Sequence, residues 1–174
     1  MAVRLAPATL HAHAPRTVLV PLNLFGLAAE LTALGREWRV KDEFHVTAAN
    51  AAWLAERLGR DVADVWAAVV AAIDGRGAGL VRLAPELRLA EEGEERTLVV
   101  MARVDGLAGL YRDLSARLGA PLTPPPAHVT LYTRPGGKAI GLHDLAELDE
   151  LTRPLSAAET AALVAAAGLE ALLD

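Results

Sequence analysis

The sequence predicts an α+β protein in which antiparallel strands combine with short amphipathic helices. Three observations support this class: alternating segments at 43–49 and 127–132, capped helical segments between them, and one long segment with the pattern of a β-hairpin. With 174 residues, the chain can bury most of its apolar surface without disulfides, which its lack of cysteine excludes. We therefore expect one folded domain.

The first half of the chain is expected to begin with strands and to continue into two helices. Residues 17–25 are β-branched and apolar enough to form a strand, whereas 26–38 resembles a helix, or a loop with a helical turn. The next strand leads into Asn50, a candidate N-cap for a helix that stops at Gly59. Asp61 is placed to cap a second helix, whose apolar stripe comprises Val62, Val65, Trp66, Val69 and Ile73.

The second half contains the hairpin, one helix, a further strand and a helical tail. Residues 79–106 form two extended runs joined by an acidic turn that contains Gly93. Asp105 is a candidate cap for a helix over 105–119, with its apolar side at Leu107, Leu110, Tyr111, Leu114 and Leu118. A proline-rich approach precedes the strand at 127–132, and Ser156 with Glu159 forms a capping box in a helical tail over 152–174.

The tripeptide His-Val-Thr occurs twice, once in each half, in a chain with only five histidines. In a strand, residues two apart point to the same side about 6.6 Å apart, so each copy presents one imidazole and one hydroxyl to one face. The first copy supplies His45 and Thr47, and the second supplies His128 and Thr130. One copy alone carries little information, whereas two copies in similar strands suggest a shared site rather than two solvated faces that match by coincidence.

Paired imidazoles suit acid–base chemistry on a phosphodiester. Histidine titrates near neutrality, so one imidazole can take a proton from the nucleophile while the other gives a proton to the leaving oxygen. The two hydroxyls would donate hydrogen bonds to phosphoryl oxygens as charge develops. We therefore predict His45 and His128 as catalytic residues, Thr47 and Thr130 as phosphate ligands, and no metal or other cofactor.

The two motifs resemble those of the two-histidine (2H) phosphoesterase superfamily, which includes LigT-like RNA 2',3'-cyclic phosphodiesterases and 2'-5' RNA ligases. The family pattern is His, a hydrophobic residue, then Thr or Ser, often followed by Leu; the second motif matches fully, whereas the first has Ala48 in the Leu position. The resemblance implies a bilobed α+β domain over 1–174, with two antiparallel sheets around a groove, pseudo-twofold symmetry and one motif strand in each of two intertwined lobes. It also implies metal-independent cleavage of a 2',3'-cyclic phosphate or a related small nucleotide or RNA-end phosphodiester. The alternative is a non-catalytic module that binds a nucleotide or an RNA end on the same fold.

Three residues beside the second motif are candidate substrate contacts. Tyr132 alternates onto the His/Thr face, where it would stack on a base or bond a phosphate, although packing on a neighbouring strand explains it equally well. Arg134 and Lys138 flank a glycine-rich segment whose amides would meet a phosphate, but which is also an ordinary turn. His143 is assigned to a helix start beside Asp144, without a functional role.

Composition restricts the partners. The formal net charge of −5 argues against a broad electrostatic grip on long nucleic acid, whereas a small phosphate ligand needs only a few cations, for which Arg36, Arg39 and Lys41 precede the first motif. Hydrophobic residues make up 53% of the chain, yet charged residues interrupt every apolar run before it reaches the length of a membrane span. The first sixteen residues lack the unbroken apolar core of a signal peptide. We expect a cytoplasmic monomer that does not contact membranes.

Overall fold

The computed structural model describes residues 11–13, 16–74, 76 and 79–169, which form nine strands and five helices. The strands are β1 (His11–His13), β2 (Thr17–Leu22), β3 (Glu30–Ala33), β4 (Arg36–Val40), β5 (Phe44–Asn50), β6 (Val81–Glu92), β7 (Glu95–Val104), β8 (His128–Thr133) and β9 (Thr152–Pro154). The helices are α1 (Ala51–Leu58), α2 (Val62–Ile73), α3 (Leu107–Leu118), α4 (Leu145–Leu151) and α5 (Ala157–Ala167). The α+β class is confirmed.

All strands join one antiparallel network, in the order β1-β2-β5-β8-β7-β6-β9. The network branches at β8, because one edge of this strand pairs with β5 near its start and with β4 near its end. The β3–β4 hairpin extends from this branch. The resemblance implied two antiparallel sheets, whereas the structure has one connected sheet that branches at β8.

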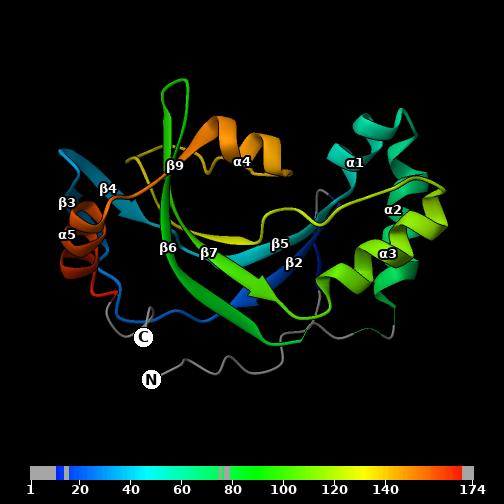
Figure 1. Ribbon diagram of the computed structural model, residues 1–174, viewed down its shortest axis with the longest axis horizontal. Helices are drawn as coiled ribbons and strands as arrows, with labels where there is room; N and C mark the ends of the chain where they lie inside the picture. The colour runs from blue at the N-terminus through cyan, green and yellow to red at the C-terminus, as the bar shows by residue number, and fades with distance from the viewer. Residues whose placement is uncertain (1–10, 14–15, 75, 77–78, 170–174) are drawn as a thin grey trace.

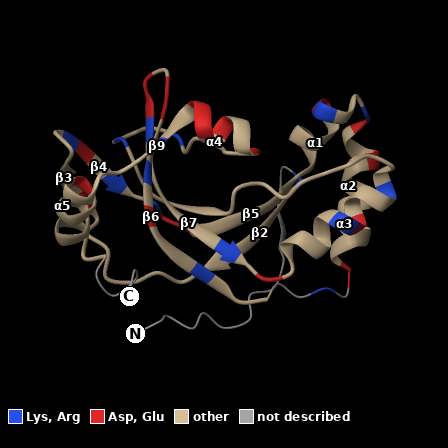
Figure 2. Cartoon of the chain, viewed as in Figure 1, with Lys and Arg blue, Asp and Glu red and all other residues tan. Residues whose placement is uncertain are grey.

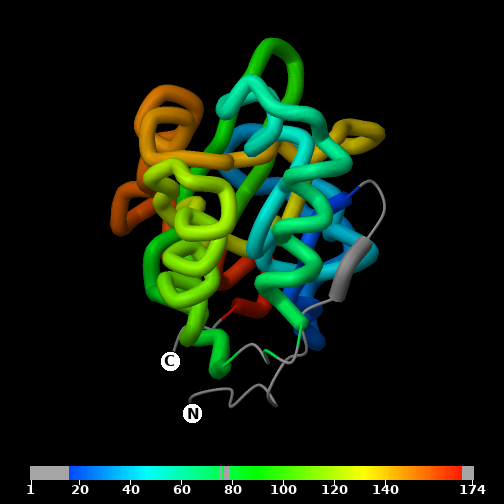
Figure 3. Tube along the Cα trace, turned by 90° about the vertical axis from the view of Figure 1, so that its right-hand side faces the viewer, coloured from blue at the N-terminus to red at the C-terminus, as the bar shows by residue number. Residues whose placement is uncertain are grey.

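The helices gather in three places around the sheet (Figure 1). At one end, α2 contacts both α1 and α3, and Figure 3 views the molecule from this end. At the other end, α5 contacts β3. The short helix α4 lies above the sheet in Figure 1, and contacts β9 and β6. The sheet face between α4 and α1 is the face that carries the histidine motifs.

The main hydrophobic core lies on the opposite face of the motif strands. Val46 and Ala48 of β5, with Val129 and Leu131 of β8, have no exposed surface. They pack in one cluster with residues from the helices, including the α3 residues predicted to form its apolar side. Burial of one face orients both strands, which leaves the alternating histidines and threonines on the other face.

Residues 30–40 form a β-hairpin, so the expectation of a helix, or of a loop with a helical turn, over 26–38 was wrong. Ala33 pairs with Arg36, and the two residues between them have positive φ angles, 57° for Leu34 and 69° for Gly35. Positive φ at both central positions is the geometry of a tight hairpin turn that follows the twist of the strands. The usual signal for this turn is Asn-Gly or Asp-Gly, and Leu34 does not provide it.

Of the four N-cap residues that the sequence predicts for α1, α2, α3 and α5, three are confirmed and one differs. Asn50, Asp61 and Ser156 cap α1, α2 and α5 through their side chains, and Ser156 forms the predicted capping box with Glu159. In α3 the N-cap is Gly106, with φ of 88° and no side-chain cap, instead of Asp105. The backbone N–H of Asp105 donates to the carbonyl oxygen of Leu80, and its carbonyl oxygen accepts from the N–H of Gly79. These bonds hold Asp105 against the segment that leads into β6.

The tail over 152–174 is not helical throughout, which corrects the sequence prediction. Its first three residues form β9, which extends the sheet by pairing with β6. Helix α5 follows over Ala157–Ala167 and ends at Gly168, which has φ of 74°. Residues 170–174 lie outside the described part of the chain.

Candidate active site

The two His-x-Thr motifs lie on adjacent antiparallel strands. Val46 of β5 pairs with Val129 of β8, so one step along the strands places His45 opposite Thr130 and Thr47 opposite His128. The local twofold axis of this strand pair passes between the two valines, and relates one motif to the other. Each histidine therefore lies opposite the threonine of the other motif.

All four motif side chains line one small pocket, as their alternation predicted. Its volume is about 120 Å³, and the remaining wall comes from residues 139–143, a segment that crosses the motif face ahead of α4. We call this segment the strap. It contributes Ala139, Ile140, Gly141, Leu142 and His143 to the lining. The motif strands thus form the floor of the pocket, and the strap forms a wall.

His128 is held in one orientation. Its Nδ1 lies 2.7 Å from the carbonyl oxygen of Pro126, which can only accept, so Nδ1 carries the proton and Nε2 has the lone pair. Burial lowers the pKa of His128 below its ordinary value, and the nearby His143 and His45 lower it further, against an opposing effect of the Pro126 hydrogen bond. A neutral imidazole with a fixed tautomer is suited to accept a proton.

Acidification should destabilise the fold through His128. Because burial lowers its pKa in the folded state, the unfolded chain binds this proton more readily, with a pKa of about 6.5. The free energy of unfolding should therefore fall as the pH drops below about 6.5, and this loss should level off below the lowered folded pKa. Urea unfolding at pH 7.5 and 5.0 tests this: His128→Gln should lose less stability between the two pH values than the wild type. An equal loss in both proteins would contradict it.

The two threonine hydroxyls are available for a ligand. Thr47 and Thr130 are both partly exposed at the pocket, and neither hydroxyl forms a hydrogen bond to another described residue. Hydroxyls rotate to suit a partner and donate readily to a phosphoryl oxygen. Together with the imidazoles they form two pairs of one imidazole and one hydroxyl, one pair on each strand.

The sequence analysis missed His143, which lies in the same pocket. Its Nδ1 is 3.0 Å from Oε2 of Glu147, and its ring stacks on Trp53 with centroids 5.5 Å apart. Its Nε2 is 3.3 Å from Nδ2 of Asn50. The only signal in the sequence was the four-residue spacing to Glu147, which is common on helices and does not reveal contact with α1.

The contacts of His143 define its tautomer. Oδ1 of Asn50 accepts from the backbone N–H groups of Ala52 and Trp53, so the amide nitrogen is the group that faces His143. Nε2 of His143 therefore accepts, and Nδ1–H donates to the carboxylate of Glu147. Nε2 thus fixes the strap to the N-cap of α1, and Nδ1 fixes it to Glu147 of α4, which assigns His143 to positioning the pocket wall.

A salt bridge reinforces the same attachment. Nη1 of Arg57 lies 2.7 Å from Oδ2 of Asp144, and its guanidinium lies 5.0 Å from the centre of the Trp53 ring. The pKa of Asp144 is lowered mainly by the backbone N–H of Glu147 and also by Arg57. Asp144 is the N-cap of α4, so one carboxylate joins the start of α4 to α1.

Tyr132 does not reach the pocket, which corrects its assignment as a candidate substrate contact. Tyr132 pairs with Leu98 and Thr130 pairs with Val99, so Leu131 is an extra residue in β8 and interrupts the alternation. The ring of Tyr132 is fully buried, and its hydroxyl donates to the carbonyl oxygen of Ala28 at 3.0 Å. Burial raises its pKa to about 12, so the hydroxyl keeps its proton.

The other candidate contacts are also directed elsewhere. Arg134 donates from Nε and Nη2 to Glu95, and the backbone N–H of Lys138 donates to the same carboxylate. Arg134 is the main cause of the lowered pKa of Glu95. Neither basic residue lines the motif pocket. Two of the three cations expected before the first motif are similarly engaged, since Arg36 pairs with Glu91 and Arg39 with Glu30.

The three histidines of the pocket do not form a metal site. Within the described ranges, no three His, Asp or Glu side chains are grouped as metal ligands would be. The backbone of His11–His13 forms β1, which pairs with β2, whereas the His11 and His13 side chains lie outside what the structure describes.

Comparison of the chain with protein-family models, with curated proteins and with solved structures found no match. The function proposed below therefore depends on the geometry of the motif pocket. Among the helices the structure describes, none is long and apolar enough to cross a membrane.

Proposed function

We propose that this protein is a metal-independent phosphodiesterase of the two-histidine type, acting on a 2',3'-cyclic phosphate or a related small phosphodiester. The observation that carries the proposal is the arrangement of both His-x-Thr motifs around one pocket, related by the local twofold axis of β5 and β8. On this proposal, the strands on the β5 side of the sheet correspond to one lobe of a two-histidine phosphoesterase, and the strands on the β8 side correspond to the other.

The geometry suggests a division of roles between the histidines. Neutral His128, with its lone pair on Nε2, takes a proton from the attacking water as the water oxygen bonds to phosphorus. Protonated His45 gives its proton to the ribose oxygen as the bond from phosphorus to that oxygen breaks. The product is a phosphate monoester, and both histidines exchange protons with solvent before the next turnover.

The threonines act on the phosphoryl group in this scheme. Thr47 and Thr130 lie opposite the two histidines, so each can donate to a non-bridging oxygen while the imidazoles flank the phosphorus. Hydrogen bonds aimed at developing charge stabilise the transition state more than the ground state. Thr47→Val and Thr130→Val should each cost about 1–3 kcal/mol in kcat/KM, which is the range for leaving one acceptor without its hydrogen-bond partner.

Turnover of 2',3'-cyclic AMP with EDTA present tests the proposal directly. We expect release of a nucleoside monophosphate and a bell-shaped dependence of kcat/KM on pH, because one imidazole must be neutral and the other protonated. Complete loss of activity in EDTA, or a flat profile between pH 5 and 8, would count against the proposal. Binding of the nucleotide without turnover would favour the alternative of a non-catalytic binding module.

A further inference from the structure

A second and larger pocket adjoins the motif pocket at His45. Its volume is about 610 Å³, and His45 lines both pockets. Its other walls come from β2, the segment that follows it, and the start of β5, and they include Asn23, Phe25, Asp42, Glu43 and Phe44. We call it the Phe25 pocket.

The volumes of the two pockets indicate which part of a substrate each can hold. Pockets that hold a drug-sized organic ligand measure about 300–1,000 Å³, so the motif pocket, at about 120 Å³, has room for a phosphate group but not for a nucleoside. The Phe25 pocket falls within that range. An organic group attached to a phosphate beside His45 can therefore be accommodated on the Phe25 side.

The Phe25 pocket presents aromatic surface to solvent. The side chain of Phe25 is 81% exposed, which makes it the most exposed large hydrophobic side chain in the part of the chain that the structure describes. Phe44 is partly exposed and lies directly before His45 in β5. Exposed aromatic rings beside a polar site are suited to stack on a nucleobase, which is a flat apolar partner.

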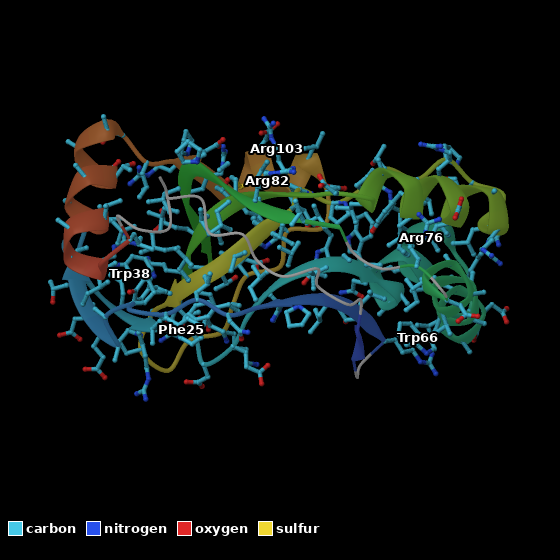
Figure 4. All side chains as sticks on the ribbon, turned by 90° about the horizontal axis from the view of Figure 1, so that it is seen from below. Phe25, Trp38, Trp66, Arg76, Arg82 and Arg103 are labelled. Atoms are coloured by element: carbon cyan, nitrogen blue, oxygen red, sulfur yellow. The ribbon has the colours of Figure 1, made fainter. Side chains whose placement is uncertain are left out.

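Charge around the two pockets disfavours a second phosphate. Among the residues that the structure describes, neither lining contains a Lys or an Arg, whereas the Phe25 pocket contains Asp42 and Glu43, which are both exposed. Figure 2 shows β2 and β5 without charged residues. In Figure 4, Arg82 and Arg103 lie across the molecule from Phe25, so they do not offset these carboxylates locally.

We propose that the Phe25 pocket binds the nucleoside of a substrate with a single phosphate, and that it selects cyclic mononucleotides over RNA ends. This inference rests on the proposed function. The base stacks on Phe25, and the exocyclic amino groups of adenine, guanine or cytosine donate to Asp42, Glu43 or the side-chain oxygen of Asn23. An RNA end would bring the phosphate of the preceding nucleotide towards Asp42 and Glu43, where like charges repel.

Two substrates with the same reactive group test the selection. We expect kcat/KM for 2',3'-cyclic AMP to exceed, by about tenfold or more, that for a trinucleotide RNA that ends in a 2',3'-cyclic phosphate. Added salt should raise kcat/KM for the RNA, because it screens the repulsion by exposed carboxylates, and should change the value for the mononucleotide little. A preference for the RNA, or an RNA rate that falls steeply with salt, would overturn the inference.

Variants test the pocket itself. Phe25→Ala should raise KM for 2',3'-cyclic AMP by roughly 5- to 150-fold, the range for loss of one base stack. Val70→Ala is a matched control, because Val70 is another exposed hydrophobic residue but lies on α2, outside both pockets. The double substitution Asp42→Asn with Glu43→Gln should narrow the preference for the mononucleotide over the RNA. An unchanged KM in Phe25→Ala would overturn the nucleoside assignment.

Binding of the product analogue 3'-AMP separates failure of this inference from failure of the proposed function. If no substrate is turned over but 3'-AMP binds and Phe25→Ala weakens the binding, the catalytic proposal fails and the nucleoside pocket stands. If turnover occurs and Phe25→Ala changes neither KM nor 3'-AMP binding, the pocket assignment fails alone. If neither turnover nor binding is found, both are overturned.

Discussion

His45→Ala and His128→Ala are each expected to lower kcat by about 10²–10⁴, the usual contribution of a general acid or base. The physical reason is that each imidazole moves a different proton in the same step, so removal of either one interrupts proton transfer. The double variant should lose much less than the product of the two single losses, because the groups act as a unit. Steady-state kinetics with 2',3'-cyclic AMP provides the measurement, and urea unfolding of each variant provides the control for folding.

A change of leaving group can tell the two histidines apart. If His45 is the acid, His45→Ala should recover much of its rate on a nucleotide p-nitrophenyl ester, whose leaving phenolate needs no proton. His128→Ala should not recover, because the attacking water still lacks its base. Recovery by His128→Ala alone would reverse the assignment based on the Pro126 contact. A His45→Ala enzyme with the parental rate would end the catalytic proposal.

The parts of this site that could be predicted from the sequence depend on local periodicity. A strand repeats every two residues, so the shared face of His45 and Thr47, and that of His128 and Thr130, follows from the chain itself. Helix caps such as Asn50 and Ser156 are equally local, and they were predicted correctly.

The parts that could not be predicted depend on distant partners. The pairing of Val46 with Val129 sets the register that brings the motifs together, and no pattern near either residue specifies it. His143 joins the pocket because its neighbours Asn50 and Trp53 come from a segment about ninety positions earlier. Tyr132 leaves the motif face because of one extra residue in β8, which is visible only against β7.

The strap explains how a small pocket forms on an open sheet face. Strands β5 and β8 provide only a floor, and the wall at residues 139–143 is held in place by contacts of His143 and Asp144 with α1. Asn50 ends the first motif strand, and its side-chain amide both caps α1 and donates to His143 of the strap. The chemistry of the motifs and the position of the strap are therefore coupled through β5.

Trp38→Ala is expected to have the largest effect on stability, about 3–5 kcal/mol in the free energy of unfolding. Trp38 lies on β4, is 1% exposed and donates from Nε1 to the carbonyl oxygen of Ala33 at 2.9 Å. Its removal leaves a large cavity at the hairpin that joins β8 and removes the side-chain hydrogen bond to Ala33. At about 2–4 °C per kcal/mol for a chain of this size, the Tm should fall by roughly 6–20 °C.

Trp66→Ala provides the matched control for Trp38→Ala, because Trp66 is only partly buried, on α2 (Figure 4). Its loss should cost clearly less, since part of the indole already faces solvent. Neither tryptophan lines the motif pocket, so kcat of the folded fraction at 20 °C should stay close to the wild-type value in both variants. Similar Tm losses in the two variants would show that the core at β4 is not the more tightly packed site. A selective loss of kcat in Trp38→Ala would instead mean that the hairpin helps to set the geometry of β8.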